Sequence, residues 1–398
     1  MLKRTLAPLL GKLAQAYPVV TLTGPRQSGK TTLVRAVFRQ YDHMSLEDPD
    51  FRTFASEDPR GFLDQFTGPV VLDEIQRTPN LFSYIQTVVD EDPTPGRFVL
   101  TGSQDFLLLR SISQSLAGRT AILHLLPFSW SELQRRSPIA LSGIGRVMPR
   151  RKQPTGLDLM NVLFTGFYPR IHDRQLEPGR WLADYYLTYV ERDVRQVENV
   201  GDLEAFGRFV RLCAGRNGQL LNLSSLGNDA GISHVTAKRW LSILESSCLI
   251  KLLRPHHHNF SKRLVKRPKL YFLDSGLLCY LLRIRSPDDL RMHASRGSVF
   301  ESFILSEFVK NYVHHGLEPD VYFWRDSAGH EIDVLLESGS ELLAVEIKSG
   351  QTIAADFFSG LEYWRRLVDD PKAPAALIYG GDRTYKRRGI NVYSWSVL

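Results

Sequence analysis

Cysteine is scarce in this chain: Cys213, Cys248 and Cys279 stand far apart and form no CxxC pair. This usage argues against a disulfide framework and a cysteine-based zinc site, and it is typical of a protein of the reducing cytoplasm. No run approaches about 18 consecutive apolar residues, so the sequence predicts no transmembrane helix and no membrane partner. Apolar residues at helical spacing near the N-terminus indicate a surface helix and not a signal peptide.

The remaining composition is that of a globular protein. The 398 residues are too many for one ordinary domain and predict two or three. Apolar residues make up 43% and charged residues 23%, which argues against disorder. The net charge of +7 permits an acidic partner, but only a clustering of basic residues would indicate one.

Short apolar runs alternate with helical stretches over the first 130 residues. The runs Val19–Thr23, Val70–Asp73, Phe98–Thr101 and Ala121–Leu125 lack polar alternation, as expected for strands buried on both faces of a parallel sheet. Residues 134–158 are rich in Arg, Pro and Gly and indicate a long loop. The pattern predicts an α/β fold.

The strongest motif is GPRQSGKT at residues 24–31, a complete G-x4-G-K-[ST] between an apolar strand and a helical stretch. Glycines let backbone N–H groups surround phosphate oxygens, and the helix N-terminus adds its dipole. Lys30 would reach the β- and γ-phosphates and Thr31 would ligate Mg²⁺. A chance Gly-Lys turn is the alternative. The residues expected to bind ATP are Gly24, Pro25, Arg26, Gln27, Ser28, Gly29, Lys30, Thr31 and Thr32.

Two acids follow the apolar strand 70–73, about forty residues after this loop. We expect Asp73 to hold Mg²⁺ together with Thr31, and Glu74 to orient the attacking water as a catalytic residue. Two acids after a strand are also a common start of a helix. The spacing from the loop favours the phosphate role.

Two further catalytic candidates lie downstream. Ser103 follows the strand 97–101, where a polar side chain would sit beside the γ-phosphate. Arg119 precedes the predicted strand at 121–125, where an arginine can reach a neighbouring subunit's nucleotide and stabilise transition-state charge. A solvated surface arginine is an equally good interpretation of Arg119.

Together these motifs resemble the AAA-type P-loop ATPases. That resemblance implies assembly into a ring or another oligomer with the ATP site between subunits. The turn at residues 165–169 resembles the Gly-x-Pro turn that lies against adenine in related signalling ATPases, although only Gly166 stands where two glycines are common.

Residues 220–254 predict a helix-turn-helix: helices at 223–230 and 234–245 flank a turn at Gly231, with Ser233 as the cap. Val235, Leu241, Ile243 and Leu244 are expected to face the core, and Thr236, Lys238 and Arg239 the solvent. Strands at 249–253 and 269–273 would enclose a wing.

The wing region is basic. No acid occurs between residues 246 and 273, whereas many Lys and Arg do, and phosphate binding is the natural interpretation. Winged helices also serve as packing modules, so this alternative stays open. Three histidines at 256–258 indicate a solvated wing tip rather than a metal site. The residues expected to bind DNA are Lys238, Arg239, Lys262, Arg263, Lys266 and Arg267.

The C-terminal region carries Asp333, twelve residues, and then Glu346-x-Lys348 across a predicted hairpin. Alternation places Glu346 and Lys348 on one strand face, and two carboxylates can hold Mg²⁺ while a lysine positions water. With Glu301 on a preceding helix, the arrangement resembles the PD-(D/E)xK nuclease superfamily, and a helix at 356–367 would complete its αβββαβ core. A Glu–Lys ion pair without catalysis is the alternative.

The full motif order resembles a widespread prokaryotic family of AAA-type ATPases whose C-terminal half is a domain of unknown function. We therefore expect an ATPase domain at 1–165, a helical lid at 166–211, a winged-helix-like domain at 212–285 and a restriction-endonuclease-like α/β domain at 286–398.

The predicted function is that of a cytoplasmic, oligomeric, Mg²⁺-dependent ATPase that acts on DNA as a motor or remodeller, with branched DNA as one candidate substrate. An ATP-regulated nuclease of defence or repair, with a second Mg²⁺ at the C-terminal site, is one alternative. A signalling ATPase with a protein partner is the other.

Overall fold

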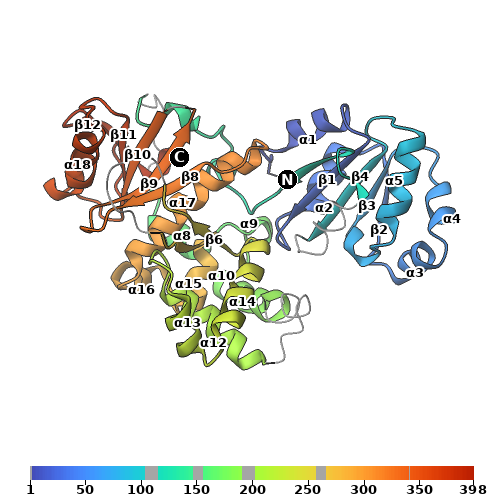
Figure 1. Ribbon diagram of the computed structural model, residues 1–398, viewed down its shortest axis with the longest axis horizontal. Helices are drawn as coiled ribbons and strands as arrows, with labels where there is room; N and C mark the ends of the chain where they lie inside the picture. Colours follow the sequence, from blue (N-terminus) through green and yellow to red (C-terminus); the bar gives the residue numbers. More distant parts are fainter. Residues whose placement is uncertain (1, 104–114, 147–155, 191–201, 257–265, 340) are drawn as a thin grey trace.

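The computed structural model describes residues 2–103, 115–146, 156–190, 202–256, 266–339 and 341–398 (Figure 1). The N-terminal part is at the right of Figure 1, the helical central part lies below, and the C-terminal part is at the left. None of the described helices is both long and apolar enough to cross a membrane.

The N-terminal part contains a five-stranded parallel sheet in the order β2-β3-β4-β1-β5, which confirms the predicted α/β fold. The central strands β1, β3 and β4 are apolar, whereas β2 has the polar sequence DHMS and was not predicted. The strands are β1 (Val19–Gly24), β2 (Asp42–Ser45), β3 (Val70–Asp73), β4 (Phe98–Ser103) and β5 (Thr120–His124).

Alternate strand residues pack on opposite faces of this sheet. Val20 and Leu22 contact the helices α1 and α2, and Leu72 and Leu100 pack on the other side with α3 to α5. The prediction that the strands are buried on both faces is wrong for β5, which is an edge strand with Ile122 42% exposed. The helices are α1 (Ala7–Ala14), α2 (Lys30–Val37), α3 (Pro49–Glu57), α4 (Pro59–Asp64) and α5 (Leu81–Glu91), and the 3₁₀ turn η1 is Ile75–Arg77.

The central part is mainly helical. A two-stranded antiparallel ribbon, β6 (Ile250–Leu253) with β7 (Lys269–Phe272), follows the predicted pair of helices α13 and α14. The helices are α7 (Trp130–Leu133), α8 (Leu159–Thr165), α9 (Pro169–Arg174), α10 (Pro178–Tyr185), α12 (Leu203–Gly215), α13 (Leu223–Ala230), α14 (His234–Ser246), α15 (Ser275–Leu281) and α16 (Pro287–Met292), with short turns η2 (Leu141–Gly143) and η3 (Tyr186–Val190).

The C-terminal part is a mixed six-stranded sheet in the order β12-β13-β11-β10-β9-β8. Val334 and Val345 face the long helix α17, and Leu335 and Ala344 face α18 on the other side. Its elements are α17 (Arg296–His314), β8 (Val321–Arg325), β9 (Glu331–Ser338), β10 (Glu341–Lys348), η4 (Ala355–Phe358), α18 (Ser359–Leu367), β11 (Ala375–Tyr379), β12 (Tyr385–Arg387), β13 (Ile390–Ser394) and η5 (Trp395–Val397).

One hydrophobic core joins the central and C-terminal parts, since α17 contributes residues to a cluster that runs from Trp130 to Leu398. The Trp130 indole N–H donates to the Ser396 carbonyl at 3.0 Å, and the Trp130 ring lies 5.1 Å from that of Trp395. The last residues of the chain are thereby packed against the segment that follows β5.

Candidate functional site

The phosphate-binding loop lies at the carboxyl edge of the parallel sheet, between β1 and α2. Gly24 has φ +147°, and a Cβ there would lie 2.2 Å from the Leu125 carbonyl oxygen. Gly29, directly before α2, has φ +95°. Both backbone positions require glycine, which is the physical reason for these two residues of the motif.

The Lys30 ammonium is buried and donates to the carbonyls of Gly24 and Pro25, at 3.0 Å each. Burial lowers the pKa of Lys30, and the nearby charges of Glu74 and Asp73 partly oppose that effect. The lysine is therefore held within the loop, next to the positions where phosphate charge would compensate its burial.

Thr31 and Asp73 meet, as a magnesium-binding pair must. The Thr31 hydroxyl donates to Asp73 Oδ2 at 2.9 Å, and the Thr101 hydroxyl donates to Asp73 Oδ1. A hydroxyl and a carboxylate beside a phosphate loop are oxygen donors that suit Mg²⁺, so these residues fit the cation that the motif implies.

Glu74 has left-handed backbone geometry with φ 58° at the end of β3. Its Oε2 accepts from Gln76 Nε2 at 2.5 Å and from Ser103 Oγ at 3.2 Å. The structure thus places the predicted Ser103 against the predicted Glu74. Gln76 was missed, and its only sequence signal is its position two residues after the acid.

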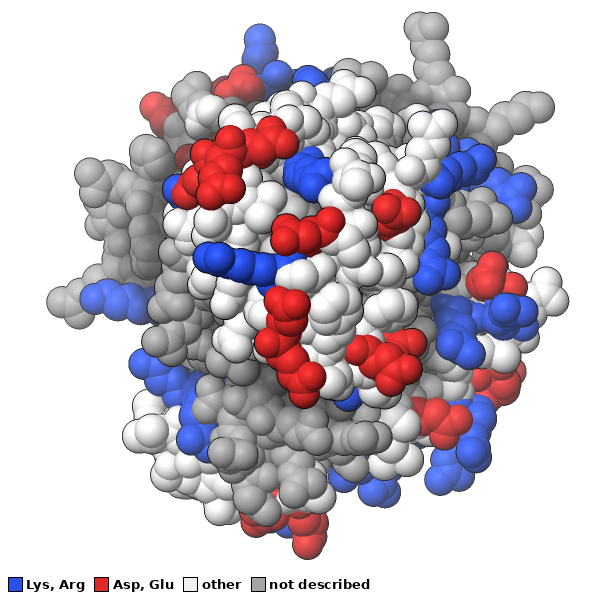
Figure 2. Space-filling model, turned by 90° about the vertical axis from the view of Figure 1, so that its right-hand side faces the viewer, with Lys and Arg blue, Asp and Glu red and all other residues white. Residues whose placement is uncertain are grey.

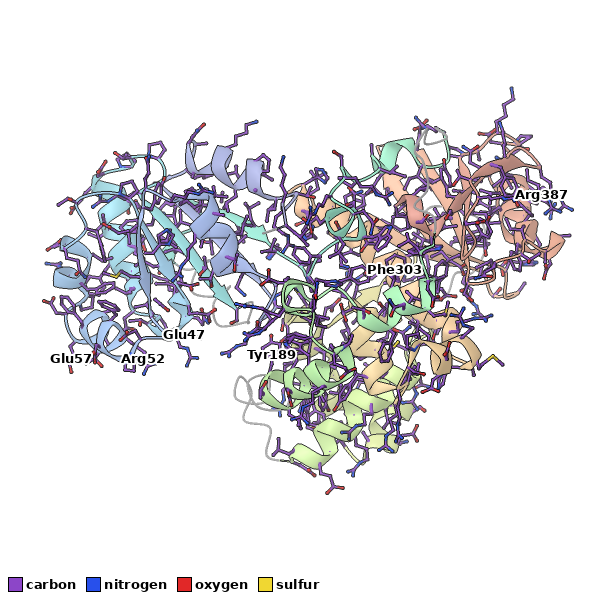
Figure 3. All side chains as sticks on the ribbon, turned by 180° about the vertical axis from the view of Figure 1, so that it is seen from behind. Glu47, Arg52, Glu57, Tyr189, Phe303 and Arg387 are labelled. Atoms are coloured by element: carbon purple, nitrogen blue, oxygen red, sulfur yellow. The ribbon has the colours of Figure 1, made fainter. Side chains whose placement is uncertain are left out.

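A cavity of about 670 Å³ opens beside the loop and contains Lys30, Thr31 and Glu74 in its lining. Pro169 also lines it, so the turn at 165–169 borders the same space. Figure 3 labels Glu47, which lines the cavity, and Tyr189, whose ring lies 5.8 Å from the Arg26 guanidinium. Four lining arginines were not predicted from the sequence: Arg4, Arg135, Arg170 and Arg174.

The size and the cationic lining of this cavity suit a nucleoside triphosphate. The outer face of the same domain has a different character: Figure 2 shows Asp and Glu side chains spread across it, with Lys and Arg mainly toward the rim.

Arg119 lies at the amino end of β5, and so at the opposite end of the parallel strands from the phosphate loop. Its guanidinium forms a two-bond ion pair with Asp90, with Nε–Oδ1 at 2.5 Å and Nη2–Oδ2 at 3.0 Å. Because all five strands are parallel, their amino ends face away from the chain's own phosphate loop, which lies at the carboxyl ends. Arg119 and the other catalytic candidates are not brought together within one chain.

Helix α14 has a core face made by Ala237, Trp240, Leu241 and Leu244. Lys238 and Arg239 lie on its exposed face, as expected. The prediction that Val235 faces the core was wrong: it is 75% exposed, because it lies about 200° around the helix from Ala237.

The basic wing is only partly described. Lys262 and Arg263 lie outside the described residues, whereas Lys266 and Arg267 are exposed just before β7. The first of the three histidines, expected in a solvated wing tip, is instead buried. His256 is 5% exposed and packs against the Tyr322 ring, because the chain here pairs with β8.

The structure brings Asp333, Glu346 and Lys348 together on the β9–β10 hairpin. The Lys348 ammonium donates to Glu346 Oε2 at 2.6 Å and to Asp333 Oδ2 at 3.3 Å. Glu301 approaches from α17, and its Oε2 accepts from the Tyr271 hydroxyl at 3.3 Å. Asp333 and Glu346 are both buried.

The pKa values of Glu301 and Glu346 lie above the usual range of a glutamate. Burial, reinforced by the charge of Asp333, raises the pKa of Glu301 to about 7 and that of Glu346 well above its usual range. Burial opposes the charge on Lys348, but Asp333 and Glu346 outweigh it and raise its pKa. The site therefore keeps Lys348 charged, while Glu301 and Glu346 hold their protons to a higher pH than usual.

The second Mg²⁺ expected at this site remains a prediction. Lys348 bridges the two carboxylates that were expected to share the cation. Across the residues that the structure describes, no group of three or more His, Cys, Asp or Glu side chains is arranged to hold a metal ion.

Three family models match the chain. An AAA domain matches residues 16–134, a domain of unknown function (DUF8612) matches 156–288, and another (DUF4143) matches 296–398. The first spans the parallel sheet and the phosphate loop, so the chain contains an AAA-type, P-loop ATPase domain that binds ATP.

Two relatives are similar to the chain: uncharacterized protein Rv2008c of Mycobacterium tuberculosis and uncharacterized protein Mb2031c of Mycobacterium bovis. Each is 30% identical over 387 residues, which cover 96% of this chain and 81% of the relative. The chain belongs to the same family as these mycobacterial proteins.

Among solved structures, the Walker-type ATPase PABY2304 of Pyrococcus abyssi aligns with a TM-score of 0.41 and 17% identity, over 70% of this chain and 95% of that one. A single-substitution variant of Thermotoga maritima RuvB aligns with a TM-score of 0.31 and 18% identity, over 62% and 87%. Both scores are too low for the arrangement of the domains or for function to be inferred from them.

Proposed function

We propose that the chain is a Mg²⁺-dependent ATPase that acts on DNA as a motor or remodeller. The observation that carries the ATPase part is the convergence of Lys30, Thr31, Asp73 and Glu74 around one cationic cavity. Lys30 would bind the β- and γ-phosphates, Thr31 and Asp73 would hold Mg²⁺, and Glu74 would orient the attacking water. Mg²⁺ supplies charge neutralisation at the transferred phosphate when it is bound.

Ser103 and Gln76 would keep Glu74 in place for this task. Both donate to the same carboxylate oxygen, which leaves the other oxygen of Glu74 available to accept a water proton. Glu74→Gln should therefore bind ATP and fail to hydrolyse it, whereas Lys30→Ala should lose tight binding.

The DNA part rests on the exposed face of α14 and on the segment before β7. Lys238 and Arg239 lie beside the exposed apolar Val235, a combination that suits phosphates together with a thymine methyl group. We infer that residues 212–285 form a winged-helix-like DNA-binding domain, joined by a lid at 166–211 to an ATPase domain at 1–165.

In an oligomer, Arg119 would take part in ATP hydrolysis at the site of a neighbouring subunit. Because Arg119 faces away from its own phosphate loop, it can contribute to hydrolysis only at a neighbour's site, after exchanging Asp90 for a phosphate. In that arrangement Arg119→Ala and Glu74→Gln subunits should complement each other at mixed interfaces. A failure to regain any activity on mixing would contradict the role of Arg119.

The C-terminal part, residues 286–398, has the element order α17-β8-β9-β10-α18-β11, which suits a restriction-endonuclease-like domain. We propose that it binds nucleic acid without cutting, because the Lys348 ammonium already pairs with both Asp333 and Glu346. The convergence of these three residues nevertheless makes a nuclease the second candidate.

The test is the ATPase rate of the wild-type protein with single-stranded, duplex, forked and four-way DNA, with Lys30→Ala as the control. Stimulation that weakens steeply with salt supports action on DNA. An unchanged rate with every DNA would favour a protein partner instead. Labelled DNA in Mg²⁺ or Mn²⁺, with Asp333→Ala as the control, tests cutting: cleavage lost in that variant would establish the nuclease.

A further inference from the structure

Arg4 precedes α1 and is buried against the phosphate loop, far from it in sequence. Its guanidinium uses all three nitrogens: Nη1 donates to the Ser28 carbonyl at 2.8 Å, Nη2 to the Leu126 carbonyl at 2.6 Å and Nε to Glu132 Oε1 at 3.2 Å. Only 5% of the residue is exposed. Three bonds from one rigid fork fix the Ser28 carbonyl relative to the segment after β5.

The bond to Ser28 determines where the next N–H points. The Ser28 carbonyl and the Gly29 N–H belong to one planar trans peptide unit, in which these two groups point in opposite directions. Gly29 is in the left-handed region, with φ +95°, and a Cβ there would lie 3.6 Å from Arg4 Nη1. Arg4 thus holds the carbonyl side of the peptide and turns the N–H to the other side.

Glu132 anchors Arg4 in turn. Its Oε1 also accepts from the Thr5 backbone N–H at 2.7 Å, and its Oε2 from the Ser129 N–H at 3.0 Å. His314 of α17 lies 3.6 Å from the same carboxylate. Both partners of the Arg4–Glu132 pair are almost fully buried, so neither can be removed alone without leaving an uncompensated charge.

We propose that Arg4 is a positioning residue for ATP binding, which holds the Ser28–Gly29 peptide with its N–H directed at the nucleotide phosphates. The inference rests on the proposed ATPase function. Arg4 acts on the backbone of the phosphate loop through the Ser28 carbonyl, and Glu132 supplies its countercharge.

The experiment separates this role from simple stabilisation. A fluorescent ATP analogue is titrated into the wild-type protein, Glu132→Gln, Arg4→Met and the double variant Arg4→Met/Glu132→Gln, and the melting temperature of each is recorded. Arg4→Met alone should lower the melting temperature, because Glu132 is left unpaired. The double variant leaves no unpaired charge, so it should melt at or above Glu132→Gln. It should nevertheless bind the analogue about tenfold or more weakly than Glu132→Gln, which keeps the Arg4–Ser28 bond.

Equal affinity of the double variant and Glu132→Gln would overturn the inference. Arg4→Lys provides a second test that keeps the charge. A lysine ammonium lacks the planar fork that spans the three acceptors, so the affinity of this variant for the analogue should also fall. Wild-type affinity in Arg4→Lys would equally overturn the positioning role. If the wild-type protein bound no nucleotide, the proposed ATPase would fail, and this inference with it.

Discussion

The strongest pH-dependent prediction concerns Glu301 on α17. Burial and the charge of Asp333 raise its pKa from 4.5 to about 7. The folded protein therefore keeps a proton on Glu301 over a pH range in which the unfolded chain has lost it, so stability falls as pH rises from about 4.5 to about 7 and then levels off. At about 1.4 kcal/mol per pKa unit, the loss amounts to about 3 kcal/mol at pH 8.

Glu301→Gln removes this loss, because glutamine carries no ionisable proton and its oxygen can still accept from Tyr271. The variant should be up to about 3 kcal/mol more stable than the wild-type protein at pH 8, and only about 1 kcal/mol more stable at pH 5. Hydrogen exchange of β9 peptides, followed by mass spectrometry, measures the local opening free energy of the C-terminal sheet without assuming that the whole chain unfolds in one step.

Glu362→Gln is the matched control, since Glu362 lies on α18, outside this cluster, and pairs with Arg388 at the surface. It should change the opening free energy of β9 little at either pH. The reasoning is refuted if Glu301→Gln stabilises β9 equally at pH 5 and pH 8, or if it destabilises β9 at pH 8.

Two predictions concern packing. Gly24→Ala should weaken binding of a fluorescent ATP analogue at least tenfold, because the added Cβ would clash with the Leu125 carbonyl. The control Gly68→Ala, whose Cβ would meet nothing within 4 Å, should bind the analogue as the wild-type protein does. Normal binding by Gly24→Ala would contradict the geometry. Lys269→Met should lower the opening free energy of β9 by about 1 to 3 kcal/mol, measured by hydrogen exchange, because it removes the buried partner of Glu331 and leaves only the more exposed Arg325. Lys269→Met/Glu331→Gln should recover most of the loss. An unchanged opening free energy in the single variant would contradict this account.

Local patterns were enough to predict the elements that are defined by neighbouring residues. The glycines and Lys30 of the phosphate loop, the apolar strands around them and the helix 223–230 were found because each depends on a few consecutive side chains. The parallel sheet followed from the same runs, since strands without polar alternation need cover on both faces.

Several features could not be predicted, because they depend on contacts between distant residues. Strand β2 is polar and is formed by pairing with β3. Lys269 lies in the basic stretch between residues 246 and 273, for which phosphate binding was expected, yet it is buried in an ion pair with Glu331 of β9. Val235 is apolar, and only the packing of α14 on its neighbours decides that it faces solvent.

The sequence by itself predicted the residues of the phosphate loop and the acids that follow the next strand. Only the tertiary structure decided what surrounds them. Arg4 is a single arginine without a motif, and its role depends on the fold placing Ser28 and Glu132 within reach of one guanidinium. The sequence spacing likewise predicted that Asp333 and Glu346 meet, but not that Lys348 bridges them, because a side chain's partner is set by the space that the packed sheet and helix leave around it.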